Sequence, residues 1–570
     1  MVDETLASPD KPHVSSRVSF RPTLRVETLV LLVVTFLIAT ANGAWWQAVL
    51  SGRSWSSPAT WSFVAACFVA LVALHFAVLA TFAHHWIVKP LLTALVIAAA
   101  GAAYYMRTFA IILDPSMIQN VLRTDTREAR DLLNWGMVAW VALWSAVPVA
   151  FIWWAKVRRT TLVRALFVRA GTVLGALIVA VLAVLTMSRD ITSFMRTQHE
   201  ARYLINPGNF LYGFGLNSMR RVADTGTTRD VIGRDAKVIH VAMASKPRVL
   251  LLVVGETARA ENFSLLGYPR ETNPELEKLD VTAFSQVSSC GTSTEVSVPC
   301  MFSPFGRADY DERRIRNSEG LLDVLVRAGY SVKWIDNQSG CKGVCSGSHI
   351  EVSQLDAASA PDLCDGKECL DEILVRTLDT ELRSIRGDTV LVMHMMGNHG
   401  PAYFKRYPPP FRRFTPDCAT AQLRDCTRAE VVNAYDNAIL YTDHVLAQLV
   451  TSLARSADRI DSAMLYVSDH GESLGEKGLY LHGIPYAFAP SQQTHVPMVL
   501  WLSPALTSSG DVRAGCVRDR ADEPYSHDNL FHSVLGLLNV RTAAYRPERD
   551  IFDGCRGRSY TVQSAANQRS

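Results

Sequence analysis

Charged residues are missing from five long runs of this 570-residue sequence. The uncharged runs cover residues 28–52, 54–88, 90–106, 132–155 and 170–188. Each run can supply the roughly 17–25 apolar residues that cross the hydrocarbon core of a bilayer, and residues 109–113 can extend the shortest one. Five such runs are very unusual in a soluble protein, so we predict five membrane-spanning helices.

Three further absences exclude other classes of protein. The formal net charge is only +3, which gives no reason to expect nucleic acid as a partner. The sequence contains no pair of CxxC motifs, so zinc-ribbon spacing is excluded. The first uncharged run lacks a small-residue cleavage pattern, and we therefore interpret it as a membrane anchor and not as a signal peptide.

Lysine and arginine are distributed unevenly between the segments that connect the uncharged runs. Successive connecting segments lie on alternate sides of the membrane. The segments on one side carry Lys11, Arg17, Arg21, Arg25, Lys89, Lys156, Arg158, Arg159, Arg164 and Arg169. The other side carries Arg53 and a segment of balanced charge. Because basic loops stay in the cytoplasm, the N-terminus is predicted to be cytoplasmic, and everything after about residue 189 is predicted to lie outside the cytoplasm.

The cysteines support this topology independently. Ten of the eleven follow residue 289, while Cys67 lies inside the second uncharged run. Their spacing suggests four local pairs and a fifth by elimination: Cys290/Cys300, Cys341/Cys345, Cys364/Cys369, Cys418/Cys426 and Cys516/Cys555. An even number of cysteines confined to one exterior region indicates disulfides in an oxidising compartment, which in a bacterium is the periplasm.

These patterns divide the chain into four parts. We predict a cytoplasmic tail (1–25), a five-helix membrane domain (26–189), a connector along the membrane surface (190–245) and an exterior domain (246–570). The connector is assigned to the membrane surface because aromatic and arginine residues such as Phe194, Arg202 and Tyr203 suit that environment.

The exterior part alternates short apolar runs with amphipathic stretches. Strands are predicted at 249–254, 331–335, 389–393, 463–467 and 497–502, and helices at 321–328, 370–383 and 434–454. This alternation is typical of an α/β domain, because parallel strands need helical crossovers. The predicted fold class is therefore an α-helical membrane domain followed by an α/β domain with a largely parallel sheet.

Acidic and histidine side chains follow three of the predicted strands. Glu256 follows the first, His394 and His399 follow the third, and Asp469 and His470 follow the fourth. Ligands of open α/β sheets bind beyond the carboxyl ends of the strands, so these groups should converge. Two carboxylates and an imidazole suit zinc and leave a coordination position open. Taken alone, the Asp-His-Gly sequence is equally compatible with a simple turn.

A hydroxyl-rich segment, CGTSTEVSVPC at 290–300, offers candidates for a nucleophile. A turn of this composition leading into a helix presents backbone N–H groups and the positive end of the helix dipole to a phosphate. A hydroxyl bound there to zinc would have a lowered pKa. The pattern does not choose among Thr292, Ser293 and Thr294, and a helix cap without catalytic role is the simpler alternative.

Polar residues also recur every four positions between the third and fourth uncharged runs. Asn120, Thr124 and Glu128 would share one face of a helix within residues 114–131. The spacing alone favours a solvated face of an interfacial helix.

Five segments together carry a family resemblance: MIQNVL at 117–122, GETARAEN at 255–262, CGTSTEVSVPCMFS at 290–303, MGNHGP at 396–401 and SDHGESLGE at 468–476. In this order they resemble the lipid A phosphoethanolamine transferases, which include the mobile colistin-resistance enzymes and belong to the alkaline phosphatase/sulfatase superfamily. The resemblance extends over nearly the whole chain.

The resemblance implies roles for individual residues. It implies Thr294 as the nucleophile and a zinc ion held by Glu256, Asp469 and His470 together with Thr294. It implies that His399 and His482 bind the phosphoethanolamine group or a second zinc ion, and that Lys342 contacts substrate. Without the resemblance, the Lys342 loop would be interpreted as a turn pinned by a disulfide. Asn120, Thr124 and Glu128 are implied to face the catalytic pocket, which reverses the interpretation from spacing.

The implied activity is transfer of phosphoethanolamine from phosphatidylethanolamine to a phosphate of lipid A, through a covalent intermediate on threonine. The enzyme would be a monomer in the bacterial inner membrane with a periplasmic catalytic domain (246–570), and it would lower susceptibility to cationic peptides such as polymyxin. Two alternatives remain among enzymes: transfer to a core sugar of lipopolysaccharide, or transfer of phosphoglycerol. A membrane sensor or scaffold that binds phosphate without turnover is the non-enzymatic alternative.

Overall fold

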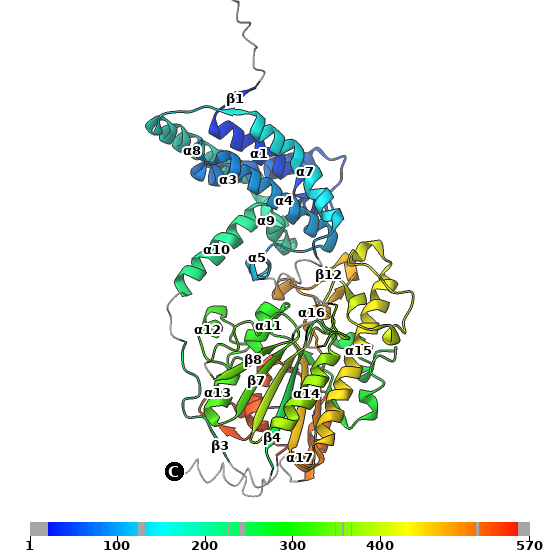
Figure 1. Cartoon of the computed structure of the whole chain (residues 1–570). Coiled ribbons are helices and arrows are strands. Elements are labelled where there is room, and N and C mark those ends of the chain that lie inside the picture. Colours follow the sequence, from blue (N-terminus) through cyan, green and yellow to red (C-terminus); the bar gives the residue numbers. More distant parts are fainter. Residues whose placement is uncertain are drawn as a thin grey trace, which may run out of the picture. The chain divides into compact units, whose positions relative to one another are not determined.

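The chain forms two compact units (Figure 1). The computed structural model describes residues 21–123, 132–224, 229–239, 246–347, 349–355, 358, 360–365, 368–508 and 512–556. One unit consists of residues 1–103 and 139–198, and the other of residues 104–138 and 199–570. Thr124 and Glu128, and most of the predicted N-terminal tail, lie outside the described residues.

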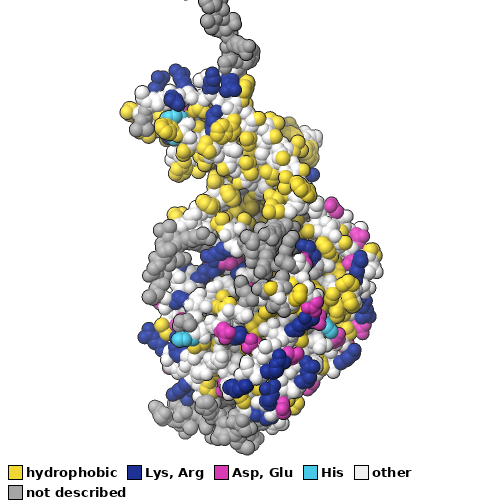
Figure 2. Space-filling model, in the orientation of Figure 1, with side chains coloured by type: hydrophobic (Ala, Val, Ile, Leu, Met, Phe, Trp, Pro, Cys, Tyr) yellow, Lys and Arg dark blue, Asp and Glu magenta, His cyan; other side chains and the backbone are white. Residues whose placement is uncertain are grey.

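Long apolar helices make up the first unit. They are α1 (Val26–Thr40), α2 (Gly43–Leu50), α3 (Pro58–Phe82), α4 (Val88–Phe109), α7 (Trp135–Trp154) and α8 (Leu162–Thr186), of which α4 and α7 reach into the second unit. Among the described residues, α3, α4, α7 and α8 are long and apolar enough to cross a membrane, and α1 with α2 makes a fifth span if the bent pair counts as one. Hydrophobic side chains cover the visible face of this unit (Figure 2).

Two details of these helices differ from the sequence expectation. The first uncharged run is not one straight helix, because α1 and α2 are bent by 60° at a short break. Charge patterns could not reveal the bend, since the residues on both sides of it are apolar. The last helix, α8, begins at Leu162 and therefore includes Arg164 and Arg169. Long basic side chains can follow an apolar surface while their charged ends stay in water, so a helix can begin before its uncharged run.

The basic segments meet at one end of the helical unit. Strand β1 (Thr23–Leu24) pairs in parallel with β2 (Lys156–Val157). The Lys89 ammonium donates to the carbonyl oxygen of Ala155 at 2.6 Å. The N-terminal segment, Lys89 and the segment after α7 are therefore neighbours, as the predicted topology requires.

A seven-stranded sheet forms the centre of the second unit (Figure 1). The strand order is β5 (Val281–Phe284), β13 (Met498–Leu502), β10 (Asp461–Ser468), β4 (Arg248–Gly255), β9 (Thr389–His394), β7 (Ser331–Asp336) and β8 (Ile350–Gln354). Neighbouring strands are parallel except that β13 runs antiparallel to β10 and β5. The predicted α/β class with a largely parallel sheet is confirmed.

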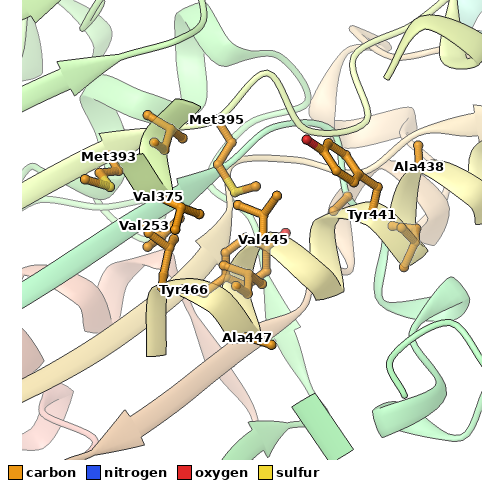
Figure 3. Close-up of a cluster of buried hydrophobic side chains, with 14 of the residues drawn as sticks. Val253, Val375, Met393, Met395, Ala438, Tyr441, Val445, Ala447 and Tyr466 are labelled. Carbon is orange, nitrogen blue, oxygen red and sulfur yellow. The ribbon is translucent and has the colours of Figure 1, made fainter. Parts of the chain in front are cut away.

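Helices cover both faces of this sheet. Successive side chains of a strand point to opposite faces, so the apolar residues of β4 are buried on both. On one face, Val249, Leu251 and Val253 of β4 pack with α14 (Glu372–Ser384) and α15 (Arg428–Arg455). Figure 3 shows part of this cluster, in which Val253 and Met393 of the sheet lie near Val375 of α14 and Val445 of α15. On the other face, Leu250, Leu252 and Val254 pack with α13 (Leu321–Ala328) and α19 (Leu530–Leu537). Burial on both faces explains why β4 is apolar throughout.

Shorter elements complete the second unit. They are α5 (Pro115–Arg123), α10 (Gly208–Asp224), α11 (Thr294–Met301), α12 (Glu312–Arg316), α16 (Ser491–Thr494), α17 (Pro504–Ser508), α18 (Ala514–Asp519), and the strand pairs β15 (Val540–Arg541) with β3 (Lys237–Val238), β14 (Tyr525–Ser526) with β6 (Val287–Ser288), and β11 (Ser473–Leu474) with β12 (Tyr480–Leu481). The segment 190–245, predicted as a connector, contains α10, β3 and most of α9 (Ser188–Thr197). Its position along a membrane surface stays a prediction.

Five disulfides lie in the second unit. They join Cys290 to Cys300, Cys341 to Cys345, Cys364 to Cys369, Cys418 to Cys426 and Cys516 to Cys555, the same partners that the spacing suggests. Cys67 is buried and unpaired in α3. The first disulfide encloses the segment from which α11 begins.

Candidate metal and phosphoryl-transfer site

Two neighbouring strands bring Glu256 and Asp469 together. Strands β4 and β10 pair in parallel, and Gly255 lies opposite Ser468 at their carboxyl ends. The next residue of each strand, Glu256 and Asp469, therefore leaves the sheet at the same edge. His470 follows directly, and ligand atoms of all three buried residues lie within 4.8 Å of one another. Register alone thus assembles a set of two carboxylates and one imidazole.

The hydroxyl of Thr294 faces this cluster from the first residue of α11. Its Oγ1 lies 3.2 Å from both carboxylate oxygens of Glu256 and 3.4 Å from His470 Nε2. The two preceding hydroxyls have other acceptors: Thr292 donates to the carbonyl oxygen of Ile484 at 2.7 Å, and Ser293 donates to Asn120 Oδ1 at 3.4 Å. Of the three hydroxyls that the sequence left open, that of Thr294 is the one bonded to the carboxylate cluster.

Hydrogen bonds from the surrounding backbone orient these side chains. The Nδ1 of His470 lies 2.9 Å from the carbonyl oxygen of Gly471, which acts as acceptor when Nδ1 carries the proton and leaves the Nε2 lone pair toward Thr294. Asp469 Oδ1 accepts the N–H groups of Thr257 at 3.1 Å and His470 at 2.7 Å. The other oxygen, Oδ2, is buried and has no hydrogen-bond partner among the described residues. A buried carboxylate oxygen without a donor is suited to a cation.

The pKa values of the cluster are also consistent with a cation site. Burial and the nearby Glu256 carboxylate raise the pKa of Asp469 well above its usual range. Burial would also raise the pKa of Glu256, but the neighbouring imidazoles of His394 and His470 hold it below its usual value. Burial and the adjacent His482 lower the pKa of His470 to about 3, so its imidazole is neutral. A nearby cation stabilises the charged form of a buried carboxyl group, so this donor set of two carboxyl groups and a neutral imidazole fits zinc.

Asp336 and His394 form a carboxylate–imidazole pair next to Glu256. The sequence analysis named His394 as a residue at a strand end but did not identify its partner. His394 Nδ1 lies 3.0 Å from Asp336 Oδ1, and its Nε2 lies 3.7 Å from Glu256 Oε2. Burial would lower the pKa of His394, but Asp336 and Glu256 raise it to about 9. Asp336 is the last residue of β7, so inspection of every strand end would have found it.

A second group of side chains adjoins His470. The ring of His482 lies 4.3 Å from the His470 ring and 6.0 Å from the His399 ring. Burial would lower the pKa of His482, but Glu472, whose Oε1 lies 3.4 Å from Nδ1, raises it to about 9. Glu472 is fully buried and also accepts a hydrogen bond from the Tyr403 hydroxyl at 3.0 Å. The sequence analysis did not assign a role to Glu472, although it lies in the SDHGE segment.

Of the other described residues that the sequence analysis singled out, Asn120 contacts a neighbour of Thr294 and Lys342 does not. Asn120 on α5 reaches Ser293, the neighbour of Thr294. Lys342 lies in the loop closed by Cys341 and Cys345, where its ammonium donates to Ser339 Oγ at 2.5 Å. No described contact of Lys342 reaches the carboxylate cluster.

The α/β fold and the carboxylate–imidazole cluster place the second unit in the sulfatase class of proteins. The family model described as Sulfatase matches residues 248–540, which include the whole sheet and every member of the cluster. A second model, described as Phosphoethanolamine transferase EptA/EptB, matches residues 71–220.

Relatives that cover nearly the whole chain define the family. Phosphoethanolamine transferase EptA of Escherichia coli (strain K12) is 37% identical over 94% of this chain and 98% of the relative. Phosphatidylethanolamine transferase Mcr-1 of Escherichia coli is 36% identical over 94% of this chain and 98% of the relative. The solved integral membrane lipooligosaccharide phosphoethanolamine transferase A of Neisseria meningitidis matches with a TM-score of 0.88 and 36% identity, over 94% of this chain and 100% of that chain.

The chain therefore belongs to the EptA/Mcr family of phosphoethanolamine transferases and is a membrane protein of that family. The family resemblance expected from the sequence is confirmed.

Proposed function

We propose that the chain transfers phosphoethanolamine from phosphatidylethanolamine to a phosphate of lipid A, with Thr294 as the covalent carrier. The observation that carries the proposal is the position of Thr294 Oγ1, which lies 3.2 Å from both oxygens of Glu256 at the start of α11. A nucleophile there would meet a phosphoryl group whose oxygens face the N-terminal end of the helix. The lipooligosaccharide named for the Neisseria meningitidis relative supports a lipid A type of acceptor.

The reaction has two displacements at phosphorus. In the first, Thr294 Oγ1 loses its proton and bonds to phosphorus, while the bond from phosphorus to the diacylglycerol oxygen breaks and that oxygen takes up a proton. In the second, a phosphate oxygen of lipid A bonds to phosphorus, and Thr294 leaves and recovers a proton. The product carries an added ammonium group. This lowers the negative charge of the outer surface and weakens its attraction for cationic peptides such as polymyxin.

A zinc ion fits the proposed mechanism. Glu256, Asp469 and His470 would hold it, with Thr294 at the fourth position. When bound, zinc lowers the pKa of a coordinated hydroxyl and stabilises charge on phosphoryl oxygens. His399 and His482 would hold the phosphoethanolamine group or a second zinc ion. Lys342, Asn120, Thr124 and Glu128 are proposed to contact substrate, and the enzyme is proposed to act as a monomer.

The direct test is the mass of extracted lipid A from cells with and without the expressed chain. We expect one added phosphoethanolamine group on a lipid A phosphate. Fragmentation that places the added group on a core sugar would overturn the proposed acceptor. An added phosphoglycerol group would overturn the proposed donor, and unchanged lipid A would overturn the proposal as a whole.

The catalytic unit is proposed to face the periplasm of a bacterium, because Lys and Arg gather at the end of the helical unit that holds the N-terminal segment. Alkaline phosphatase fused after residue 240 should be active, since this enzyme needs an oxidising compartment to form its disulfides. The same fusion near residue 160 should be inactive. The opposite pattern would contradict the topology and also the proposed compartment of the five disulfides.

A further inference from the structure

A buried carboxylate lies directly beside the proposed nucleophile. Glu295 is the second residue of α11, and only 7% of its surface is exposed. A phosphoryl group on Thr294 would bring further negative charge to the same helix end. An unpaired carboxylate at this position would repel it.

Two arginines from different elements pair with Glu295. The Arg316 guanidinium on α12 donates to Glu295 Oε1 at 2.7 Å and to the Glu295 carbonyl oxygen at 2.9 Å. The Arg123 guanidinium, from the last residue of α5, donates to the same Oε1. Charge-assisted bonds of this kind are stronger and more directional than neutral ones. They neutralise Glu295 and fix the first turn of α11.

The same elements are joined by a second set of bonds. Gln119 on α5 donates to Glu312 Oε1 on α12 at 2.6 Å, and Arg316 Nε donates to the same oxygen at 3.1 Å. Gln119 and Arg123 lie four residues apart on one face of α5, as Glu312 and Arg316 do on α12. The bonds therefore close a ring from α5 through α12 to α11. In the sequence, α5 lies between the predicted membrane helices α4 and α7.

We infer that Arg123 and Arg316 are positioning residues for Thr294: they neutralise the Glu295 carboxylate and so keep the first turn of α11 open to a phosphoryl group, and through Arg123 this neutralisation depends on α5. This inference rests on the proposed role of Thr294. Arg123 neutralises Glu295, which keeps the helix end electrostatically open to the phosphoryl group. Arg316 is shared between Glu295 and Glu312, so losing Arg123 leaves two carboxylates with one arginine and an excess negative charge beside the reacting phosphorus. Losing the Glu295 carboxylate as well removes that excess charge.

The inference is tested with three full-length variants assayed for transfer from phosphatidylethanolamine: Arg123→Ala, Glu295→Gln and the double variant. Arg123→Ala should lower kcat about tenfold or more, with the donor KM nearly unchanged, because contacting charged groups are coupled on this scale. Glu295→Gln should stay within about threefold of the unchanged protein. The double variant should recover most of the activity lost in Arg123→Ala.

Arg314→Ala is the matched control, since Arg314 lies on α12 but pairs with the exposed Asp309. It should leave kcat unchanged. An increase in donor KM for Arg123→Ala without recovery in the double variant would mean that Arg123 binds substrate directly, and would overturn the inference. Unchanged kcat in Arg123→Ala would also overturn it. A Thr294→Ala variant assayed in parallel separates the two proposals. If Thr294→Ala is active, the proposed nucleophile is contradicted. If Thr294→Ala is inactive while Arg123→Ala has normal activity, only the positioning role of Arg123 is contradicted.

Discussion

Thr294→Ala is expected to lower phosphoethanolamine transfer by a factor on the order of 10⁶, the scale on which removal of the nucleophile acts in another covalent enzyme. The reason is geometric. Thr294 Oγ1 is bonded to both oxygens of Glu256, while the hydroxyls of Thr292 and Ser293 are bonded to Ile484 and Asn120. The measurement is transfer to lipid A by purified full-length protein in detergent.

Three matched variants make this result specific. Thr294→Ser keeps a hydroxyl at the same position and should retain measurable transfer. Thr292→Ala and Ser293→Ala remove the neighbouring hydroxyls and should keep much of the activity. If Thr294→Ala still modifies lipid A, direct attack of the acceptor on a bound donor becomes the better mechanism, and Thr294 becomes a metal or phosphate contact.

Asp469→Asn is expected to lose both bound zinc and transfer, the latter by about 10²–10³-fold or more, because one charged contact to the reacting centre is removed. The substitution removes one of the two carboxylates of the cluster and with it the charge that balances a divalent cation. The measurements are zinc content of the purified protein by elemental analysis and transfer before and after zinc is added back.

Asp443→Asn is the control for this substitution. Asp443 is also fully buried, but it lies outside the cluster, where its two oxygens accept the backbone N–H groups of Glu275 and Leu276, so the substitution removes a buried carboxylate elsewhere in the unit. This variant should keep its zinc and most of its activity. Retention of zinc and activity by Asp469→Asn would contradict the proposed ligand set.

The sequence predicted the fold and the carboxylate–imidazole cluster because both follow from local rules. Apolar strands alternate with helices, and ligands follow strand ends, so Glu256, Asp469 and His470 could be grouped before the register of β4 and β10 was known. The choice among Thr292, Ser293 and Thr294 could not be made from spacing, since it depends on where each hydroxyl finds an acceptor. The family resemblance favoured Thr294, and the geometry supplies a physical reason.

Other features depend on contacts between distant segments and were therefore invisible in the sequence. The bonds from Arg123 and Arg316 to Glu295 join residues separated by 172 and 21 positions. No periodicity encodes such a meeting. The bend between α1 and α2 escaped the charge pattern for a different reason, because the run is uncharged on both sides of the break. The Asn42-Gly43 pair at the break is the local signal that could have indicated it.

The central claim is that Thr294 carries phosphoethanolamine during transfer. Its most direct test is the intact mass of the purified protein after incubation with phosphatidylethanolamine in the absence of an acceptor, followed by peptide mapping. We predict an added phosphoethanolamine group on the peptide that contains Thr294, its removal when lipid A is supplied, and its absence from Thr294→Ala. An adduct on another residue, or transfer by the unchanged protein without any adduct on Thr294, would contradict the claim.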